Sequence, residues 1–201
     1  DVEVAAYLSG GIDSSSTVAY IKDIEPGVLN TFSIGFRDRD FDETEYQNEA
    51  VKFLNTRHKS ITCSSDDISQ SFPRVIWHTE TPVTRTAPAP MFLLSRLVRE
   101  NNIKVVITGE GADEMLAGYD IFKEAKIRRF WASQPDSTMR PRLLTKLYPY
   151  LPQMRQANPA ILKMFYGYKL EETDNPFYSH LLRWNNSNHI KKHFSEQLKS
   201  Q

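Results

Sequence analysis

Cysteine is almost absent from the sequence, and neither sign of charge is in excess. Cys63 is the only cysteine among 201 residues. A single thiol can form neither an intramolecular disulfide nor a cysteine metal cluster, so we expect a reducing compartment, with the cytoplasm as the default. Lys and Arg together number 25, as do Asp and Glu. No overall field therefore favours nucleic acid or an anionic membrane as a partner, and any anion site must be local.

Long apolar runs are missing as well. No stretch approaches the roughly 18 apolar residues of a membrane helix, and the first residues lack the pattern of a signal peptide. The apolar fraction of 40% supplies the core of one large soluble domain, with or without an appendage. Because the chain starts at Asp1 and ends in a polar run, we expect it to be a piece of a longer protein.

Short apolar strands alternate with amphipathic helices in the first 112 residues. Strands are predicted over residues 2–8, 29–36, 58–62 and 104–108, the first and last of them buried on both faces. Between them, helices are predicted over residues 14–24, 42–54 and 91–100, with two short helices over 64–78 that meet at Pro73, and an irregular loop over 81–90. This alternation predicts an α/β fold, a Rossmann-like parallel sheet with helices on both faces.

Beyond Tyr119 the pattern predicts helices only. Residues 120–131 are amphipathic and basic, prolines interrupt 135–152, and 158–201 are helix-like and rich in aromatic residues. We therefore expect a nucleotide-binding domain over residues 1–132 and a helical extension over 133–201. The basic residues of the first helix are interpreted as a solvated face, with contact to a triphosphate or a partner domain as the alternative. They are Lys123, Lys126, Arg128 and Arg129.

A glycine turn, Ser9–Ser15, follows the first strand and opens a helix. Glycines let backbone N–H groups approach a phosphate, and the helix start adds free N–H groups and the positive end of its dipole. The carboxylate of Asp13 would be repelled by a bare phosphate. Its presence in the turn therefore predicts a magnesium ion between the carboxylate and the phosphate. The turn has neither the Gly-Lys-Ser/Thr ending of a P-loop nor the Gly-x-Gly-x-x-Gly of a dinucleotide fold. An ordinary glycine turn is the alternative.

A second glycine turn, Thr108–Glu114, follows the last strand at the edge where parallel sheets bind ligands. Its three carboxylates would repel one another unless some meet a metal or a cationic substrate. Asp113 is the second magnesium candidate, and Glu110 could position or deprotonate an amine nucleophile. A solvated acidic loop is the alternative.

Five sequence blocks, taken in order, resemble the asparagine synthetase family of the ATP pyrophosphatase (PP-loop) superfamily. The resemblance covers most of residues 1–130, and the blocks are Ser9–Ser15, Ser33–Phe36, Glu80–Pro82, Pro90–Arg96 and Thr108–Tyr119. It implies an adenine nucleotide alpha hydrolase-like fold. In that family an N-terminal glutaminase domain releases ammonia, and a C-terminal synthetase domain uses ATP to convert aspartate to asparagine through β-aspartyl-AMP, releasing AMP and pyrophosphate.

The resemblance also implies roles for individual residues. Pyrophosphate and its magnesium ion would be held by Ser9, Gly10, Gly11, Asp13, Ser14 and Ser15. Adenosine would be lined by Leu8, Ile34, Thr108 and Gly109. Asp113 would join Asp13 at the metal and, with Glu110, belong to the catalytic residues. Related β-lactam synthetases have a tyrosine at the position of Glu110, so this glutamate favours asparagine synthetase.

The sequence departs from the family pattern at several points. The loop Pro82–Pro90 cannot be matched one to one with the corresponding loop of the better-known bacterial enzymes. Arg85 lies near the position of an arginine in their loop, so Arg85 is the substrate candidate beside Glu110. The glutaminase domain, a distal Arg-Val-Pro-Phe-Leu-Asp-like block and a catalytic lysine have no match, so we expect no turnover from this piece alone. The implied partners are aspartate, ammonia from glutamine and the glutaminase domain of the same parent chain, while a homodimer of the parent stays open.

Three alternatives remain. The first is a related amidotransferase or β-lactam-synthetase-like ligase that acts on another carboxylate. The second is another PP-loop enzyme of the tRNA-thiolating or GMP-synthesising type, although thiolation usually needs paired cysteines. The third is a non-catalytic ATP-binding domain. Among single residues, His58 is interpreted as structural and Cys63 as a small buried apolar side chain. Contacts between helices, or contacts with residues missing from this piece, are expected for Phe165, Tyr166, Tyr168, Phe177, Tyr178 and Trp184.

Overall fold

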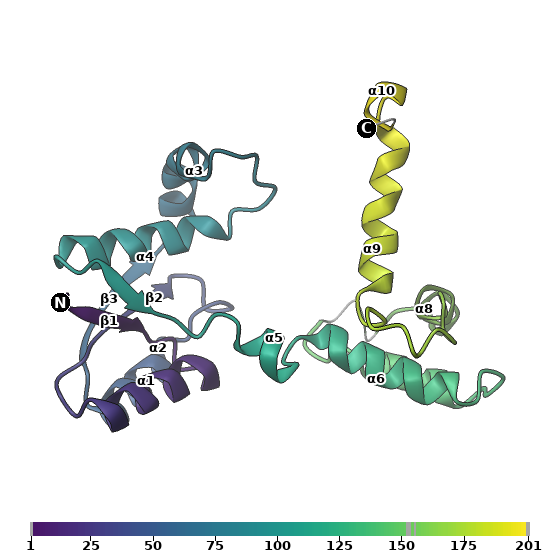
Figure 1. Cartoon of the computed structure of the whole chain (residues 1–201), viewed down its shortest axis with the longest axis horizontal. Helices are drawn as coiled ribbons and strands as arrows, with labels where there is room; N and C mark the ends of the chain where they lie inside the picture. Colours follow the sequence, from purple (N-terminus) through teal and green to yellow (C-terminus); the bar gives the residue numbers. More distant parts are fainter. Residues whose placement is uncertain (1, 152–153, 155, 200–201) are drawn as a thin grey trace. The chain divides into compact units, whose positions relative to one another are not determined.

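The computed structural model describes residues 2–151, 154 and 156–199 (Figure 1). Its contacts divide the chain into two compact units, an N-terminal unit that ends at Gly111 and a C-terminal unit that begins at Ala112. Strands and helices alternate in the N-terminal unit, as predicted. Its elements are β1 (Val4–Tyr7), α1 (Ile12–Ile24), β2 (Asn30–Phe36), α2 (Thr44–Leu54), β3 (Arg57–Cys63), α3 (Ser65–Thr79), α4 (Pro88–Glu100) and β4 (Val105–Ile107).

The four strands form one parallel sheet in the order β3-β2-β1-β4. Ala5 of β1 lies opposite Asn30 of β2 on one side and Val106 of β4 on the other. Helices α1 and α2 cover one face of the sheet, and α3 and α4 lie on the other (Figure 1). The predicted α/β fold is therefore confirmed. Because β1 and β4 are parallel neighbours, both predicted glycine turns begin at the same side of the sheet, where the carboxyl ends of the strands lie.

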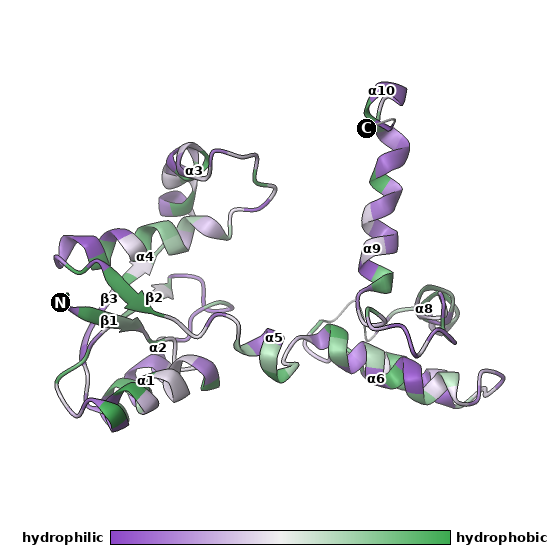
Figure 2. Ribbon diagram, viewed as in Figure 1, coloured by the Kyte–Doolittle hydropathy of each residue, from purple (hydrophilic) through white to green (hydrophobic). Residues whose placement is uncertain are grey.

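Alternation along β1 divides the core between the two faces. Ala5 packs with Phe32 and Leu94 on the α4 face, whereas Ala6 packs with Val18 on the α1 face. The strand begins with hydrophobic residues (Figure 2). Small alanine side chains let helices approach from both sides, and burial of apolar area at about 25 cal/mol per Å² makes this two-faced packing the main stabilising term. It fixes the end of β1, where the first turn begins.

Strand β4 corrects one prediction. The sequence predicts a strand buried on both faces, but Val105 and Ile107 are 41% and 39% exposed. The reason is sheet order, because β4 lies at an edge and, among the described residues, pairs only with β1. An apolar run shows that a strand prefers to be covered, but it does not show how many neighbours the strand has.

The segment around Pro73 corrects a second prediction. A single helix, α3, continues through Pro73 where two short helices are predicted. A proline inside a helix removes one backbone hydrogen bond at a cost of about 3 kcal/mol. A capping box between Ser64 and Asp67 stabilises the helix start, and Val75 is buried where α3 packs against α4. Helix α4 also begins three residues before the predicted start, at Pro88, since proline is favoured in a first turn.

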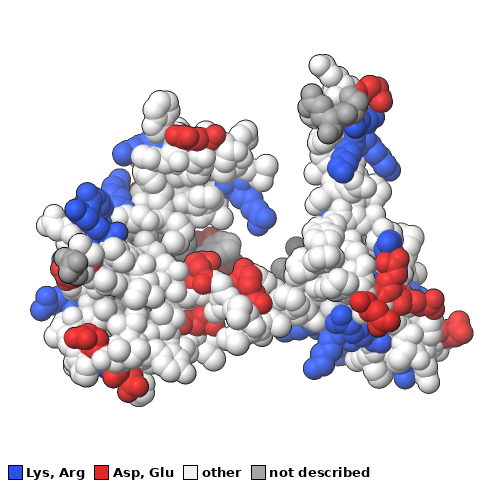
Figure 3. All heavy atoms as spheres, in the orientation of Figure 1, with Lys and Arg blue, Asp and Glu red and all other residues white. Residues whose placement is uncertain are grey.

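The C-terminal unit is helical, and its described part contains no strand, as predicted. Its elements are α5 (Ala112–Leu116), α6 (Asp120–Ala132), η1 (Arg140–Lys146), α8 (Pro159–Tyr166), α9 (Leu181–Asn188), η2 (His189–His193) and α10 (Glu196–Lys199). Across both units, no helix within the described residues is long and apolar enough to cross a membrane. Basic and acidic side chains form small separate groups on the face drawn in Figure 3, as expected for equal numbers of both.

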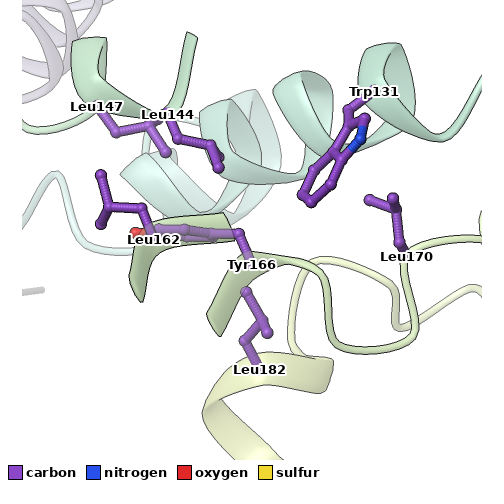
Figure 4. Close-up of a cluster of buried hydrophobic side chains, with 7 residues drawn as sticks. All are labelled: Trp131, Leu144, Leu147, Leu162, Tyr166, Leu170 and Leu182. Carbon is purple, nitrogen blue, oxygen red and sulfur yellow. The ribbon is translucent and has the colours of Figure 1, made fainter. Parts of the chain in front are cut away.

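One apolar cluster forms the core of the C-terminal unit (Figure 4). Its buried members are Trp131, Leu144, Leu147, Leu162, Tyr166, Leu170 and Leu182. Trp131 comes from α6, so this helix packs with the segment that follows it. The boundary between the two packed units therefore lies before α6, whereas the sequence predicts a nucleotide-binding domain that ends at residue 132. The boundary at residue 132 was assigned from function, and it stays a prediction.

Arg128 corrects the interpretation of α6 as a solvated basic face. Its side chain is fully buried. Nε donates to the carbonyl of Tyr166 at 2.9 Å, Nη1 to that of Tyr178 at 3.2 Å and Nη2 to that of Tyr168 at 2.6 Å. The guanidinium also lies 4.2 Å from the centre of the Tyr178 ring. Arg128 thus joins the end of α8 and the irregular backbone after it to α6, while Lys123, Lys126 and Arg129 are exposed as predicted.

The buried carboxylate of Glu124 connects the same helix to two partly buried side chains. The Glu124 carboxylate, 1% exposed, forms an ion pair with Arg183 at 2.5 Å and accepts a hydrogen bond from Tyr148. Burial and the adjacent carboxylate raise the pKa of the Tyr148 and Tyr166 hydroxyls. Tyr166 and Tyr178 are buried, as expected, whereas Tyr168, Phe177 and Trp184 are 37%, 54% and 50% exposed.

Candidate nucleotide-binding site

The first glycine turn requires glycine at position 10. The N–H of Leu8 donates to the carbonyl of Phe32 at 3.0 Å, so the sheet holds the chain up to the turn. Gly10 then adopts a φ of +83°, and a Cβ there would lie 2.5 Å from the carbonyl carbon of Tyr46 and 2.7 Å from the nitrogen of Gln47. Backbone of α2 therefore occupies the space of a side chain. Neither the conformation nor the contact tolerates another residue.

Serine hydroxyls brace this turn from inside. Ser14 Oγ accepts from the Ser9 N–H at 3.1 Å and donates to the Gly11 carbonyl at 3.2 Å. Because its single hydrogen is used there, the Ser9 hydroxyl must donate across the 2.9 Å that separates the two Oγ atoms. Ser14 is 8% exposed. The sequence predicts these hydroxyls as phosphate donors, and the structure adds that Ser14 shapes the turn.

The start of α1 presents free backbone donors. Its N-cap residue, Gly11, makes no side-chain capping bond, and the first backbone bond of the helix runs from the Ser15 N–H to the Gly11 carbonyl at 3.0 Å. The N–H groups of the first turn therefore lack intrahelical acceptors, and they lie at the positive end of the helix dipole. The half-buried Asp13 is in this turn. The arrangement can bind an anion beside one carboxylate.

The structure brings the two predicted glycine turns together. A Cβ on Gly109 would lie 3.1 Å from the backbone nitrogen of Ser14 and 3.2 Å from the Cβ of Asp13. The second turn thus lies directly against the start of α1. The Glu110 N–H donates to Thr108 Oγ1 at 3.3 Å, and the Glu110 side chain is exposed. A peptide bond at Gly109 can approach a bound group because no side chain intervenes.

Other predicted site residues lie elsewhere in the chain. Asp113 is the second residue of α5, in the C-terminal unit, and its carboxylate occupies the space beside Gly118 that a Cβ would need. Glu114, the third carboxylate of the acidic turn, accepts a hydrogen bond from the Tyr119 hydroxyl at 2.8 Å. Arg85 is exposed in the segment between α3 and α4. The contacts of the N-terminal unit therefore join the first turn to Gly109 of the second turn, whereas Asp113 belongs to the C-terminal unit.

Two residues that shape the turn are missed by sequence reasoning. Tyr46 and Gln47 contact Gly10 through their backbone, and Gln47 is 3% exposed although glutamine is usually a surface residue. A signal was present in β2, where Thr31 and Ser33 interrupt an apolar strand. Small polar residues on the inner face of a strand need buried partners, and Gln47 is one of them.

A comparison with protein families identifies the chain. Residues 1–199 match the family model described as asparagine synthase. The chain belongs to the asparagine synthase family. The family match also extends across the helical C-terminal unit, where the sequence resemblance is weak.

Curated relatives of this asparagine synthase family chain come from distant organisms. Asparagine synthetase [glutamine-hydrolyzing] 1 of Bacillus subtilis is 35% identical over 124 residues, 62% of this chain and 19% of that protein. Asparagine synthetase [glutamine-hydrolyzing] 2 of Arabidopsis thaliana is 35% identical over 136 residues, 62% and 23% respectively. Amidase chyE of Penicillium rubens is 33% identical over 137 residues, 61% and 20%. The matched part of this chain thus spans about a fifth of each relative.

The residues fit a magnesium ion that arrives with a nucleotide. Among the described residues, no cluster of three or more His, Cys, Asp or Glu side chains could hold a metal ion by itself. Magnesium in nucleotide sites takes one or two carboxylates and completes its octahedron with phosphate oxygens and water. Asp13, in the first turn of α1, supplies one such carboxylate next to free N–H groups. The donor set suits a metal shared with phosphates better than a resident metal.

Proposed function

We propose that this chain is the ATP-binding part of a cytoplasmic ligase that amidates aspartate to asparagine and releases AMP and pyrophosphate. The observation that carries the proposal is the contact of Gly109 with Asp13 and Ser14. It joins a cradle of N–H groups to a second turn that carries Glu110, the candidate for handling the nucleophile. Membership of the asparagine synthase family supports the amide-forming reaction.

In this proposal the turn Ser9–Ser15 binds the pyrophosphate part of ATP, and adenosine lies along Leu8, Ile34, Thr108 and Gly109. Asp113 joins Asp13 at the magnesium ion. Chain length is compatible with this pairing, because Asp113 is four residues from Gly109, a span of at most about 14 Å. When bound, magnesium would neutralise phosphate charge. Arg85 and Glu110 are the candidates for contact with the amino-acid substrate.

The chain's own groups account for the first half-reaction. The β-carboxylate of aspartate attacks the α-phosphorus of ATP in line, a phosphorus–oxygen bond forms, and pyrophosphate leaves with the electron pair of the broken bond. The N–H groups at the start of α1 hold the leaving pyrophosphate and stabilise the charge that grows on it. Gly10 and Gly109 keep the cradle open, and fixed positions of both reactants lower the entropic part of the barrier. The product is β-aspartyl-AMP.

Glu110 serves the second half-reaction. Ammonia attacks the activated carbonyl carbon, AMP leaves with the former carboxylate oxygen, and the nitrogen must lose a proton for the amide to form. The exposed carboxylate of Glu110, at the end of β4, accepts that proton. In the parent protein the ammonia comes from a glutaminase domain of the same chain. We leave a homodimer of the parent as an open alternative.

A related ligase acting on another carboxylate is the second candidate function. The observation that favours it is the relative named amidase chyE, whose identity to this chain is close to that of the asparagine synthetases. The departure of the loop around Arg85 from the family pattern points the same way, because this loop contains a substrate candidate.

Isotope transfer tests the proposed reaction. A longer protein that contains this chain would be incubated with ATP, ammonia and aspartate labelled with ¹⁸O in its β-carboxylate. We expect one ¹⁸O atom per AMP and equal amounts of AMP and asparagine. Formation of ADP, or of unlabelled AMP, would exclude the acyl-adenylate route. AMP formation that requires a different carboxylate would favour the second candidate.

Glu110→Gln separates the two half-reactions. In the longer protein, at saturating aspartate, we expect aspartate-dependent exchange between ATP and pyrophosphate within about threefold of the unsubstituted protein. Glutamine keeps the shape and hydrogen-bonding capacity of Glu110 towards aspartate, and adenylation needs no proton transfer to this residue. Amide formation should fall about 10²- to 10⁴-fold, the usual contribution of a general base. Glu114→Gln is the matched control, since this neighbouring carboxylate is bonded to Tyr119 and should leave both rates nearly unchanged. Equal loss of exchange and amide formation in Glu110→Gln would contradict the assignment.

A further inference from the structure

Strand β1 stops pairing with β2 where the first glycine turn begins. Within the described residues, the last bond between the two strands runs from the Leu8 N–H to the Phe32 carbonyl at 3.0 Å. Bonds between parallel strands are evenly spaced, and each further donor lies two residues along its strand. In a continued ladder the next donor would be the Gly10 N–H, and its acceptor would be the Ile34 carbonyl. Because β2 runs on to Phe36, this carbonyl lies beside the point where β1 turns away.

Gly10 does not make this bond. Its φ of +83° lies far from the extended conformation of a strand, so the chain leaves the sheet here. In the part of the chain that the structure describes, its N–H donates to no protein group. The turn thus gains a free donor, and the Ile34 carbonyl loses the partner that the ladder would supply. Ile34 is half-buried, and an acceptor without a donor costs free energy wherever water is excluded.

The side chain of Gln47, from the start of α2, supplies the missing donor. Its Nε2 donates to the Ile34 carbonyl at 2.9 Å. The orientation of the amide is fixed, because a carbonyl oxygen only accepts and the atom beside it must be the nitrogen. The Oε1 atom then faces the hydroxyl of Ser33, which donates to it at 2.8 Å. Gln47 is 3% exposed, and its amide thus fills the place in the ladder that Gly10 leaves.

The backbone of Gln47 lies against the same glycine that its side chain replaces in the ladder. A Cβ on Gly10 would lie 2.7 Å from the Gln47 nitrogen and 2.5 Å from the carbonyl carbon of Tyr46. One residue therefore acts on both partners of the missing bond, because its amide occupies the Ile34 carbonyl while its helix lies against Gly10. Bonded to β2 in this way, α2 keeps the turn from folding back onto the sheet.

We propose that Gln47 is a positioning residue for the nucleotide-binding turn. By taking the Ile34 carbonyl, its side-chain amide keeps the Gly10 N–H out of the sheet and available to a phosphate oxygen. An N–H has one hydrogen, so a bond to the carbonyl of the sheet and a bond to a ligand are alternatives. That the ligand is a phosphate group rests on the proposed function, whereas the exchange of partners at Ile34 does not.

Hydrogen exchange in the unsubstituted chain provides the direct test. Nuclear magnetic resonance would follow the backbone amide of Gly10 and the side-chain amide of Gln47. We expect little protection at Gly10, and exchange at the Gln47 side chain at least about tenfold slower than at Gln70, an exposed glutamine of α3. A protected Gly10 amide, or an unprotected Gln47 side chain, would overturn the proposal. No nucleotide is needed, so this result stands even if the chain does not bind ATP.

Gln47→Met keeps the size of the side chain but removes its donor. The Gly10 N–H is then the donor that the ladder places next to the Ile34 carbonyl, so we expect its protection to rise at least about tenfold. Affinity for magnesium pyrophosphate should fall about 10- to 100-fold, as for the loss of one hydrogen bond to a charged group. An unchanged Gly10 amide would contradict the proposal, whatever the affinity. Protection that rises without a loss of affinity would instead contradict phosphate binding at this turn.

Ser33→Ala is the matched control. It removes the other bond of the same amide and leaves Nε2 on the Ile34 carbonyl. We expect it to leave the Gly10 amide unprotected and the pyrophosphate affinity within about threefold of the unsubstituted chain. Equal changes in Ser33→Ala and Gln47→Met would mean that Gln47 only stabilises the fold, and they would contradict the proposal. Gln47→Leu, which also lacks a donor, is the second variant should the methionine variant not fold.

Discussion

Gly10→Ala is expected to weaken Mg-ATP binding by more than about 100-fold and to destabilise the N-terminal unit by about 3–5 kcal/mol. Two costs add at this position. A left-handed backbone conformation costs an ordinary residue about 1–2 kcal/mol, and φ is +83°. The new methyl group would also lie 2.5 Å from the backbone of Tyr46, which β2 and the buried Gln47 hold in place. Relief requires movement of the turn or of α2, and both shape the proposed cradle.

Gly111→Ala is the matched control for this substitution. Gly111 has a similar φ of +93°, but a Cβ there would meet no atom within 4 Å. We expect it to cost only the conformational part, about 1–2 kcal/mol. Urea unfolding followed by circular dichroism would measure both variants, and calorimetry would measure their ATP affinity. Equal destabilisation by the two alanines would contradict the idea that α2 shapes the turn.

Arg128→Ala is expected to destabilise the C-terminal unit by about 3–5 kcal/mol, the usual cost of removing one partner from a buried charged network. The arginine has no exposed surface, and its bonds end on carbonyls at the end of α8 and in the irregular segment after it, those of Tyr166, Tyr168 and Tyr178. Alanine would leave these buried acceptors without donors, at about 1–3 kcal/mol for each group that water cannot reach. It would also remove the cation from the Tyr178 ring.

Lys126→Ala, on an exposed position of the same helix, is the control and should change stability by no more than about 0.5 kcal/mol. Trp131 lies in the core of this unit, so the fluorescence of tryptophan during urea unfolding can monitor it. A loss below about 1 kcal/mol for Arg128→Ala would mean that the carbonyls find other donors and that the arginine does not organise the unit.

Local sequence patterns predicted the sheet and the turns because these depend on neighbouring residues. The apolar strand before Ser9 and the glycines after it predict a strand, a turn and a helix in that order. Parallel strands then place the turns that follow β1 and β4 at one edge. The contact of Gly109 with Asp13 results from this rule together with the adjacency of the two strands.

Features that depend on partners distant in sequence were not predictable in this way. The sequence around Arg128 predicts a basic helix face, because no neighbouring residue indicates that backbone carbonyls about 40 residues away accept hydrogen bonds from this side chain. The exposure of Val105 depends on sheet order, and the continuity of α3 through Pro73 depends on packing against α4. His58 was expected to be structural, and its two hydrogen bonds to side chains of β2 agree with that role.

Binding of Mg-ATP to this chain tests most directly whether the two glycine turns form a nucleotide site. Calorimetry would compare the unsubstituted chain, Asp13→Ala and Asp23→Ala, a substitution at an exposed position near the end of the same helix, with magnesium and with a chelator. We predict one site that binds Mg-ATP and is competed by pyrophosphate. Asp13→Ala should weaken it at least about tenfold in magnesium but little without the metal, while Asp23→Ala binds normally. Absence of binding, or an affinity that depends on neither magnesium nor Asp13, would contradict the proposed site.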